Sequence, residues 1–410
     1  MRMEETMEKK KTTWTKTRHR VITALVRPVL APYCWLRYHI HVEKFREQGN
    51  RPYLILYNHQ TGFDQFFVAL AFRGPVYYLA TEDIFSLGWI SKLLRWLVAP
   101  IPIRKQTTDI TAVMNCIKVA REGGSLCIAP EGNRTYSGRT EYMSDSIASL
   151  AKKLKLPIAL YRIEGGYGVQ PRWSDVVRRG KMRGYVSQVI EPEEYAEMKP
   201  QELFRRIEQG LSVDEAAADG VFRHGKRAEY LERAIYVCPF CGLSSWESSG
   251  HRATCQTCGR TVLYGEDKRL RGEGYDFPME FMGQWYDYQK QYVNSLDLRT
   301  MTDQPLFRDR ANISEVIVYK KKNLLRKNAD IALYGNRIVL DEATERELVI
   351  PFSEISAAAC LGKNKLNVYH GKMIYQFKGS KRFNALKYVN LYFRYKNITR
   401  GEENDQFLGL

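Results

Sequence analysis

Short apolar runs alternate with helical patterns in the first half of the chain. The runs at 53–57, 76–80, 126–129 and 158–161 have the length and composition of buried strands. Between them, the segments 64–72, 110–122 and 145–154 place apolar residues at helical spacing. This alternation predicts an α/β domain with a mixed, largely parallel sheet over residues 37–210. The charged segment 200–233 also has a helical character, and we expect 211–235 to form a helical linker.

A different pattern occupies the last part of the chain. Apolar and polar residues alternate with a period of two at 315–319, 331–334, 337–340, 348–351, 365–369 and 373–377, and 381–395 has helical spacing. The turn signals 334–336 and 370–372 separate some of these strands. The pattern predicts an antiparallel β-barrel of six or seven strands capped by a helix. Its layout resembles a pleckstrin-homology or GRAM-like domain, here at 311–398, with 263–310 as a connector.

Two segments have amphipathic character. On a helical wheel, 84–98 gathers Ser91, Lys92 and Arg95 on a narrow polar arc and leaves the rest apolar. So wide an apolar surface favours either deep burial or insertion into lipid. The basic, amphipathic segment 1–36 either lies in a membrane interface or forms a helix packed on the domain. The sequence has no uninterrupted apolar run of about 18 residues, so we expect no transmembrane span.

The overall charge points to an anionic partner. Lys and Arg number 63 against 46 acidic residues, giving a net charge of +17. Acidic membrane lipid, nucleic acid or an acidic carrier protein would suit that charge, which alone selects none of them. The first residues do not resemble a secretory signal. Four of the eight cysteines, Cys34, Cys116, Cys127 and Cys360, are scattered in apolar surroundings, as in a reduced, cytoplasmic protein.

The segment 57–64 places His59 five residues before Asp64 at the end of an apolar run. On one continuous helix these side chains would diverge, so we expect His59 to follow a strand and the chain to turn before a helix. Asp64 would then accept the Nδ1 proton of His59 and leave Nε2 as a base. The alternative is a helix cap, with Thr61 and Asp64 in a capping arrangement and His59 as an ordinary loop residue.

A second motif, 129–135, follows another apolar run. Gly132 permits a positive φ or close backbone approach, and Arg134 offers a planar fork for a phosphate. Glu131 would either accept hydrogen bonds from an acceptor alcohol or position Arg134. Arg104, which follows the apolar run 99–103, is a further candidate for phosphate binding.

Four ordered blocks, Asn58-His59-x4-Asp64, Ile103-Arg104, Pro130-Glu131-Gly132-x-Arg134 and Leu156-Pro157-Ile158, resemble the 1-acyl-glycerol-3-phosphate acyltransferase family. The resemblance covers about residues 37–210. It implies His59 as general base, Asp64 as its orienting carboxylate, and acceptor binding by Arg104, Glu131, Gly132 and Arg134. It also implies that Pro157 belongs to a structural block near the site. Asn133 stands where family members commonly have Thr or a similar residue.

Two Cys-x2-Cys pairs, Cys238/Cys241 and Cys255/Cys258, are separated by 13 residues. Two such knuckles can hold Zn²⁺ in a tetrahedron of thiolates. We therefore predict a structural zinc ribbon at 236–262. Since cysteine fills all four positions, this metal would have no open coordination site for catalysis.

Together these features predict an enzyme that moves a fatty acyl chain from an acyl thioester, acyl-CoA or acyl carrier protein, to the hydroxyl of a lysophospholipid. It would work on anionic membrane lipid, peripherally on the inner face of the membrane. One alternative keeps this chemistry on a different lysolipid or an aminolipid. Another is a catalytically inactive, basic zinc-ribbon scaffold that binds lipid or nucleic acid; the complete motifs make a nucleic-acid partner the weaker hypothesis.

Overall fold

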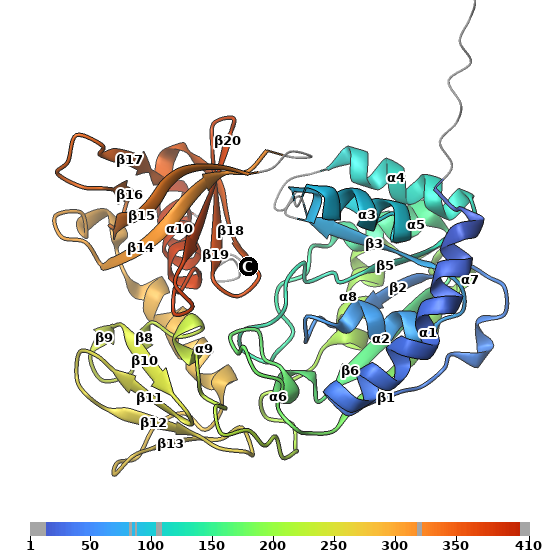
Figure 1. Ribbon diagram of the computed structural model, residues 1–410, viewed down its shortest axis with the longest axis horizontal. Coiled ribbons are helices and arrows are strands. Elements are labelled where there is room, and N and C mark those ends of the chain that lie inside the picture. The colour runs from blue at the N-terminus through green and yellow to red at the C-terminus, as the bar shows by residue number, and fades with distance from the viewer. Residues whose placement is uncertain (1–13, 82–83, 87, 104–108, 318–321, 402–410) are drawn as a thin grey trace, which may run out of the picture.

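The computed structural model describes residues 14–81, 84–86, 88–103, 109–317 and 322–401. Figure 1 shows two parts: an α/β unit, coloured blue to green, and a C-terminal unit, coloured yellow to red. The α/β unit extends from α1 (Thr17–Tyr38) to α8 (Pro200–Leu211), and the C-terminal unit ends with α10 (Leu386–Arg400).

A seven-stranded sheet forms the centre of the α/β unit. Its order is β1-β7-β6-β2-β5-β3-β4. Only the β6–β7 pair is antiparallel; the other neighbours are parallel. The expected mixed, largely parallel sheet is therefore confirmed. Its strands are β1 (Ile40–Val42), β2 (Leu54–Tyr57), β3 (Val76–Thr81), β4 (Ile101–Ile103), β5 (Ser125–Ile128), β6 (Ile158–Glu164) and β7 (Met182–Ile190).

Helices cover both faces of this sheet, which explains why its central strand β2, Leu-Ile-Leu-Tyr, is buried and apolar at every position. Leu54 and Leu56 of β2 point into a core shared with α4 (Ile110–Arg121), α5 (Ser146–Leu154) and α8. Ile55 and Tyr57 point into the opposite core, which is shared with α1 and α2 (Asp64–Ala71). The remaining helices of the unit are α3 (Trp89–Val98) and the short α6 (Gly166–Val169) and α7 (Pro192–Tyr195).

The expected helix over 200–233 is wrong beyond its first third. Helix α8 ends at Leu211, and the segment 212–230 contains no helix. After α8 the backbone bonds to the loop at 138–140 instead of continuing the helix: the carbonyl of Val213 accepts the N–H of Thr140, and the N–H of Glu215 donates to the carbonyl of Gly138. The linker 211–235 is therefore mostly irregular, with one short 3-10 turn at Leu231–Arg233.

The C-terminal unit begins with two small antiparallel sheets that carry the cysteine pairs. The first is the hairpin β8 (Val237–Cys238) and β9 (Gly242–Leu243). The second has the order β10-β11-β12-β13, from β10 (Trp246–Ser249), β11 (Arg252–Cys255), β12 (Thr261–Tyr264) and β13 (Leu270–Gly272). A 14-residue helix, α9 (Met282–Ser295), lies in the segment that the sequence left as a connector.

A second seven-stranded sheet follows, and it is antiparallel throughout. Its order, β17-β16-β15-β14-β20-β19-β18, leaves β17 and β18 at the two edges, so among the described residues it is a half-barrel and not a closed barrel. Helix α10 packs against it. The strands are β14 (Phe307–Glu315), β15 (Asn323–Leu333), β16 (Arg337–Leu340), β17 (Leu348–Pro351), β18 (Ile355–Leu361), β19 (Lys365–His370) and β20 (Met373–Gly379).

The strand expected at 315–319 is misplaced. Strand β14 ends at Glu315 and begins at Phe307, inside the expected connector 263–310. Residues 318 and 319 lie outside the described residues. Strand β18 was not expected; its run of alanines at 357–359 lacks the β-branched residues by which strands are usually found.

One continuous core runs through the C-terminal unit and into the α/β unit. It joins side chains of the cysteine-bearing sheets, α9, the half-barrel and α10, including Trp246, Trp285 and Phe377. Tyr136, Tyr167 and Trp173 of the α/β unit belong to the same cluster. The segments at 236–262, 263–310 and 311–398 therefore share a core, and that core is anchored on the α/β unit.

Candidate active site

His59 lies just beyond the carboxyl end of β2, where the chain turns before α2 begins at Asp64. The buried side chain of Asn58 stabilises this turn, because its amide forms the hydrogen bonds to β6 that a backbone residue of β2 would otherwise form. Its Nδ2 donates to the carbonyl of Ile163 at 2.9 Å, and its Oδ1 accepts the N–H of Ile163 at 2.8 Å. The pairing with β6 thus continues while the backbone leaves the strand.

Asp64 brings the two ends of the first motif together. Its fully buried carboxylate lies 2.8 Å from Nδ1 of His59 and also accepts the backbone N–H groups of Gln60 and Thr61. The Thr61 hydroxyl donates to the same carboxylate at 2.6 Å. The two interpretations of this motif therefore coexist: Asp64 organises the turn before α2, and it also orients the imidazole.

The second motif holds the backbone of His59 from both sides. The N–H of His59 donates to Oε1 of Glu131 at 3.0 Å. The carbonyl of His59 accepts the N–H of Thr135 at 3.3 Å. With Nδ1 facing Asp64, both backbone groups and one ring nitrogen are fixed, and Nε2 makes no hydrogen bond to any described residue. A neutral imidazole held in this way presents Nε2 as a base.

Glu131 acts as a clamp between the motifs. While Oε1 accepts from His59, Oε2 accepts the backbone N–H of Glu141 at 3.0 Å. Burial raises the pKa of the Glu131 carboxyl to about 8, although the two N–H donors favour its charged form. Both oxygens are engaged within the protein, which favours a role in positioning over direct contact with an acceptor.

Arg134 lies beside the turn that carries His59. A Cβ placed on Gly62 would lie 3.8 Å from Nη1 of Arg134, and this buried nitrogen has no hydrogen-bond partner among the described residues. Burial, followed by the neighbouring charge of Arg172, lowers the pKa of the guanidinium to about 10, and the group therefore stays positive at neutral pH. A cation with an unpaired donor is suited to hold an anion.

The other expected site residues are placed differently. Gly132 is exposed and has a φ of +68°, as expected for a turn that favours glycine. Arg104 lies outside the described residues. Pro157 is not near the site, because it precedes β6 and accepts the N–H of Leu54 at the amino end of β2. Strands β2 and β6 are parallel, and His59 lies beyond the carboxyl end of the four-residue strand β2, which is the end opposite to Pro157.

The environment of His59 favours the uncharged ring. Burial lowers the pKa of His59 from its ordinary value, the carboxylate of Asp64 opposes that change, and the charges of Arg134 and Arg172 add to it. The imidazole is therefore neutral at neutral pH.

Part of the chain is similar to known proteins. Residues 37–163, which span both motifs, match the model of the family described as Acyltransferase. The chain contains an acyltransferase-family domain. Among solved structures, it is similar to the crystal structure of the 1-acyl-sn-glycerophosphate (LPA) acyltransferase PlsC from Thermotoga maritima, at 17% sequence identity and a TM-score of 0.40, over 47% of this chain and 76% of that chain. No curated protein matches the chain.

The acyltransferase domain has an apolar outer face on α1 and α3. Trp89 is 72% exposed and Leu25 is 71% exposed. Other large apolar side chains of the two helices are also exposed: Val21, Val26, Val29, Tyr33, Trp35, Leu36, Ile90, Leu93, Trp96 and Val98. Ser91, from the polar arc of α3, is buried at 5% exposure and donates to the carbonyl of Ile84. Lys92 and Arg95 of the same arc are exposed, so α3 exposes most of its circumference, including apolar side chains that a helix packed on a core would bury. No helix in the described part of the chain is long and apolar enough to cross a bilayer.

The four cysteines of the C-terminal unit converge as expected. The Sγ atoms of Cys238, Cys241, Cys255 and Cys258 all lie within 4.8 Å of one another. The Sγ–Sγ distances of 3.7 Å for Cys238–Cys258 and 3.6 Å for Cys241–Cys255 exclude disulfides. A tetrahedral Zn²⁺ with Zn–S bonds of about 2.3 Å requires S–S edges of roughly 3.8 Å. The thiolates thus fit a structural zinc ion.

We expect Cys255→Ser to reduce the bound zinc from about one ion per chain to a small fraction, since three thiolates and a hydroxyl make a poor structural zinc site. Metal analysis of the purified protein measures this content, and thermal unfolding measures the accompanying loss of stability. Cys34→Ser, which changes a buried cysteine on α1, is the control and should keep its zinc. Full zinc content in Cys255→Ser would show that the cluster is not the metal site.

Proposed function

We propose that this protein transfers a fatty acyl group from an acyl thioester to the hydroxyl of a lysophospholipid such as 1-acyl-glycerol-3-phosphate. The observation that carries the proposal is the His59–Asp64 pair, with an open Nε2 and Arg134 alongside. The match of residues 37–163 to the acyltransferase family supports it at the level of reaction class.

The chemistry needs only groups present in this site and the two substrates. Nε2 of His59 removes the proton from the acceptor hydroxyl, and the oxygen attacks the thioester carbonyl. A C–O bond forms, the C–S bond breaks, and the imidazolium returns the proton to the departing thiolate. Asp64 keeps Nδ1 protonated throughout and stabilises the positive ring. The protein itself supplies no covalent nucleophile.

Arg134 supports an acceptor that carries a phosphate. Nη1 of its guanidinium lies near Gly62, within the turn that carries His59. A phosphate bound to this guanidinium would therefore place a nearby glycerol hydroxyl close to the imidazole. Another lysolipid or an aminolipid with an anionic headgroup would use the same cation. Assays of the purified protein with labelled acyl-CoA or acyl carrier protein against a panel of lysolipids separate these acceptors.

We further propose that the apolar face of α1 and α3 rests on the membrane that holds the acceptor. Exposed tryptophans suit a membrane interface, and cations lie among them: Lys92 and Arg95 are exposed on α3. Arg18 of α1 stacks on Trp96 and donates to its carbonyl at 3.0 Å, which joins the two helices into one surface. Anionic lipid would match the net charge of +17.

We expect His59→Ala to lower kcat/KM by at least about 100-fold, because it removes the general base. His41→Ala, which changes an exposed histidine on β1, is the matched control and should keep full activity. Initial rates with a lysophosphatidate acceptor and a fatty acyl-CoA measure both variants, and thermal unfolding shows that both are folded. Undiminished turnover in His59→Ala would disprove this mechanism.

Activity should fall as the pH is lowered through the pKa of His59. Protonation occupies Nε2, so the charged ring is inactive; because burial lowers this pKa, the midpoint of the decline in kcat/KM should lie below 6.5. Asp64→Asn removes the group that raises the pKa, so any residual activity should decline at a still lower pH. A pH–rate profile measures both midpoints, and a midpoint above 6.5 in the unaltered protein would contradict this assignment.

We expect the double variant Trp89→Glu/Trp96→Glu to bind vesicles of phosphatidylglycerol and phosphatidylcholine at least roughly tenfold more weakly, since two exposed rings no longer enter the lipid. Val349→Glu, which changes an exposed apolar residue on β17, is the control. Co-sedimentation at low and high salt measures binding and its charge dependence. Equal binding by the double variant and the control would exclude this face as the membrane contact.

A further inference from the structure

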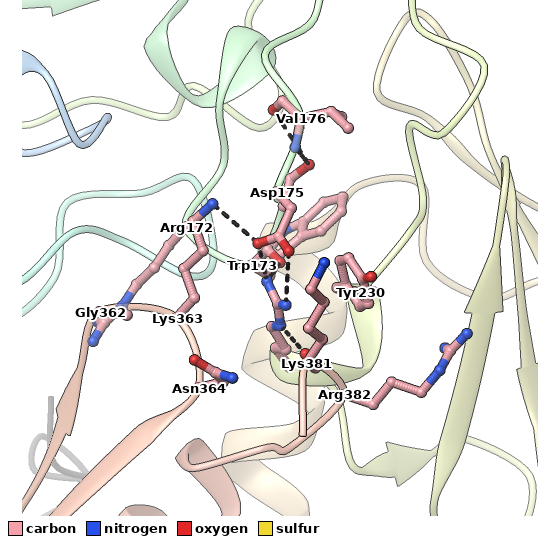
Figure 2. Close-up of polar contacts among 12 residues, drawn as sticks. Arg172, Trp173, Asp175, Val176, Tyr230, Gly362, Lys363, Asn364, Lys381 and Arg382 are labelled. Carbon is pink, nitrogen blue, oxygen red and sulfur yellow. Dashed lines mark hydrogen bonds and ion pairs between the residues drawn. The ribbon is translucent and has the colours of Figure 1, made fainter. Parts of the chain in front are cut away.

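Arg172 is a buried cation at the junction of the two units. It follows α6 in the α/β unit, yet only 1% of its surface is exposed. Figure 2 shows its side chain reaching towards Gly362, in the turn between β18 and β19 of the C-terminal unit. In the same view a dashed line joins Lys363, the residue after Gly362, to Asp175. Sequence reasoning did not find Arg172, because no motif surrounds it.

The guanidinium of Arg172 joins two segments that are far apart in the sequence. On one side, Nη1 donates to the carbonyl of Arg134 at 2.9 Å and Nη2 to Oδ1 of Asn133 at 3.4 Å. On the other side, Nε donates to the carbonyl of Gly362 at 3.2 Å and Nη2 to the carbonyl of Cys360 at 3.3 Å. A planar fork of donors can hold these four acceptors at once, which an ammonium cannot do.

Within the α/β unit, the contacts of Arg172 are to the loop that carries Arg134. Its guanidinium also lies over the ring of Tyr136, 4.2 Å from the centroid. It therefore touches three of the four consecutive residues 133–136, and its partners on that loop are a carbonyl, an amide oxygen and an aromatic ring. These contacts fix the backbone from which the Arg134 side chain projects.

Among the described residues no carboxylate forms an ion pair with Arg172, whereas the ammonium of the neighbouring Lys363 pairs with Asp175 at 3.1 Å. Burial and then the charge of Arg172 lower the pKa of Arg134. The guanidinium groups of Arg134 and Arg172 repel one another, and a bound phosphate relieves that repulsion. The junction thus combines an immobilised loop with two neighbouring guanidinium charges.

We propose that Arg172 is a positioning residue through which the C-terminal unit holds Asn133 and Arg134 in place for an acceptor with a phosphate group. The C-terminal unit is then part of the acceptor site, because β18 and the turn after it supply two of the four oxygen acceptors that fix Arg172. This proposal rests on the proposed function for the identity of the acceptor.

Arg233 provides a matched control at the same junction. It is also 1% exposed, and it joins the units by donating to the carbonyls of Trp173 and Lys381 and to the carboxylate of Asp175. It makes no hydrogen bond to the described residues 131–136. Arg172→Lys and Arg233→Lys therefore each replace a buried junction arginine, but only the first disturbs the loop.

The test compares these two variants in the full-length, zinc-loaded protein. For Arg172→Lys, loss of hydrogen bonds to a charged group should raise KM for lysophosphatidate by roughly tenfold, with kcat and KM for the acyl donor within about threefold. Arg233→Lys should show a comparable loss of thermal stability with KM for the acceptor unchanged. Hydrogen–deuterium exchange provides a readout without activity: the peptide covering 131–136 should exchange faster in Arg172→Lys than in Arg233→Lys.

The outcomes distinguish a failure of the proposed acyl transfer from a failure of the proposed role of Arg172. If the unaltered protein acylates no lysolipid, the proposed function fails, and the exchange measurement still decides whether Arg172 holds the loop. If the enzyme is active but the two variants change the acceptor KM and the exchange of 131–136 equally, Arg172 is only a structural link and the inference is overturned.

Discussion

The candidate site depends on the way one loop holds the backbone of another. His59 donates its N–H to Glu131 and accepts the N–H of Thr135, so the loop after β5 fixes the residue that follows β2. Since β2 and β5 are adjacent and parallel, both loops leave the same edge of the sheet. The imidazole is thereby oriented by Asp64 on one side and kept in register with Arg134 on the other. The two sequence motifs are thus joined by hydrogen bonds into a single site.

The C-terminal unit also packs against the part of the α/β unit that carries the site. The half-barrel, the cysteine-bearing sheets and helices α9 and α10 share a core with Trp173 and Tyr136 of the acyltransferase domain. Buried arginines at this boundary bond to backbone carbonyls on both sides, which defines the distance between the parts. The C-terminal unit is therefore continuous with the site-bearing domain in packing as well as in sequence.

The sequence predicted the features that arise from local patterns. Apolar runs located the central strands, and the motif spacing located the His59–Asp64 pair and the four cysteines. Features set by distant contacts were not predictable in the same way. The roles of Glu131 and Arg172 depend on backbone groups that only the fold brings near, and α9 lies in a Tyr- and Gly-containing segment with weak periodicity. The residue Pro157 was misplaced because it precedes the amino end of β6, whereas Ile163, near the other end of that strand, lies beside Asn58 and the site.

The span of the Arg172 contacts has a consequence for biosynthesis. The hydrogen bond from Arg172 to Gly362 joins residues 190 positions apart. A ribosome makes the chain from its amino end, so residues 133 and 134 emerge long before β18 exists. The nascent domain can assemble its parallel sheet early, but the loop beside His59 gains its last restraints only after β18 and the turn at Gly362 have been made. Maturation of this site is thus tied to synthesis of the C-terminal unit.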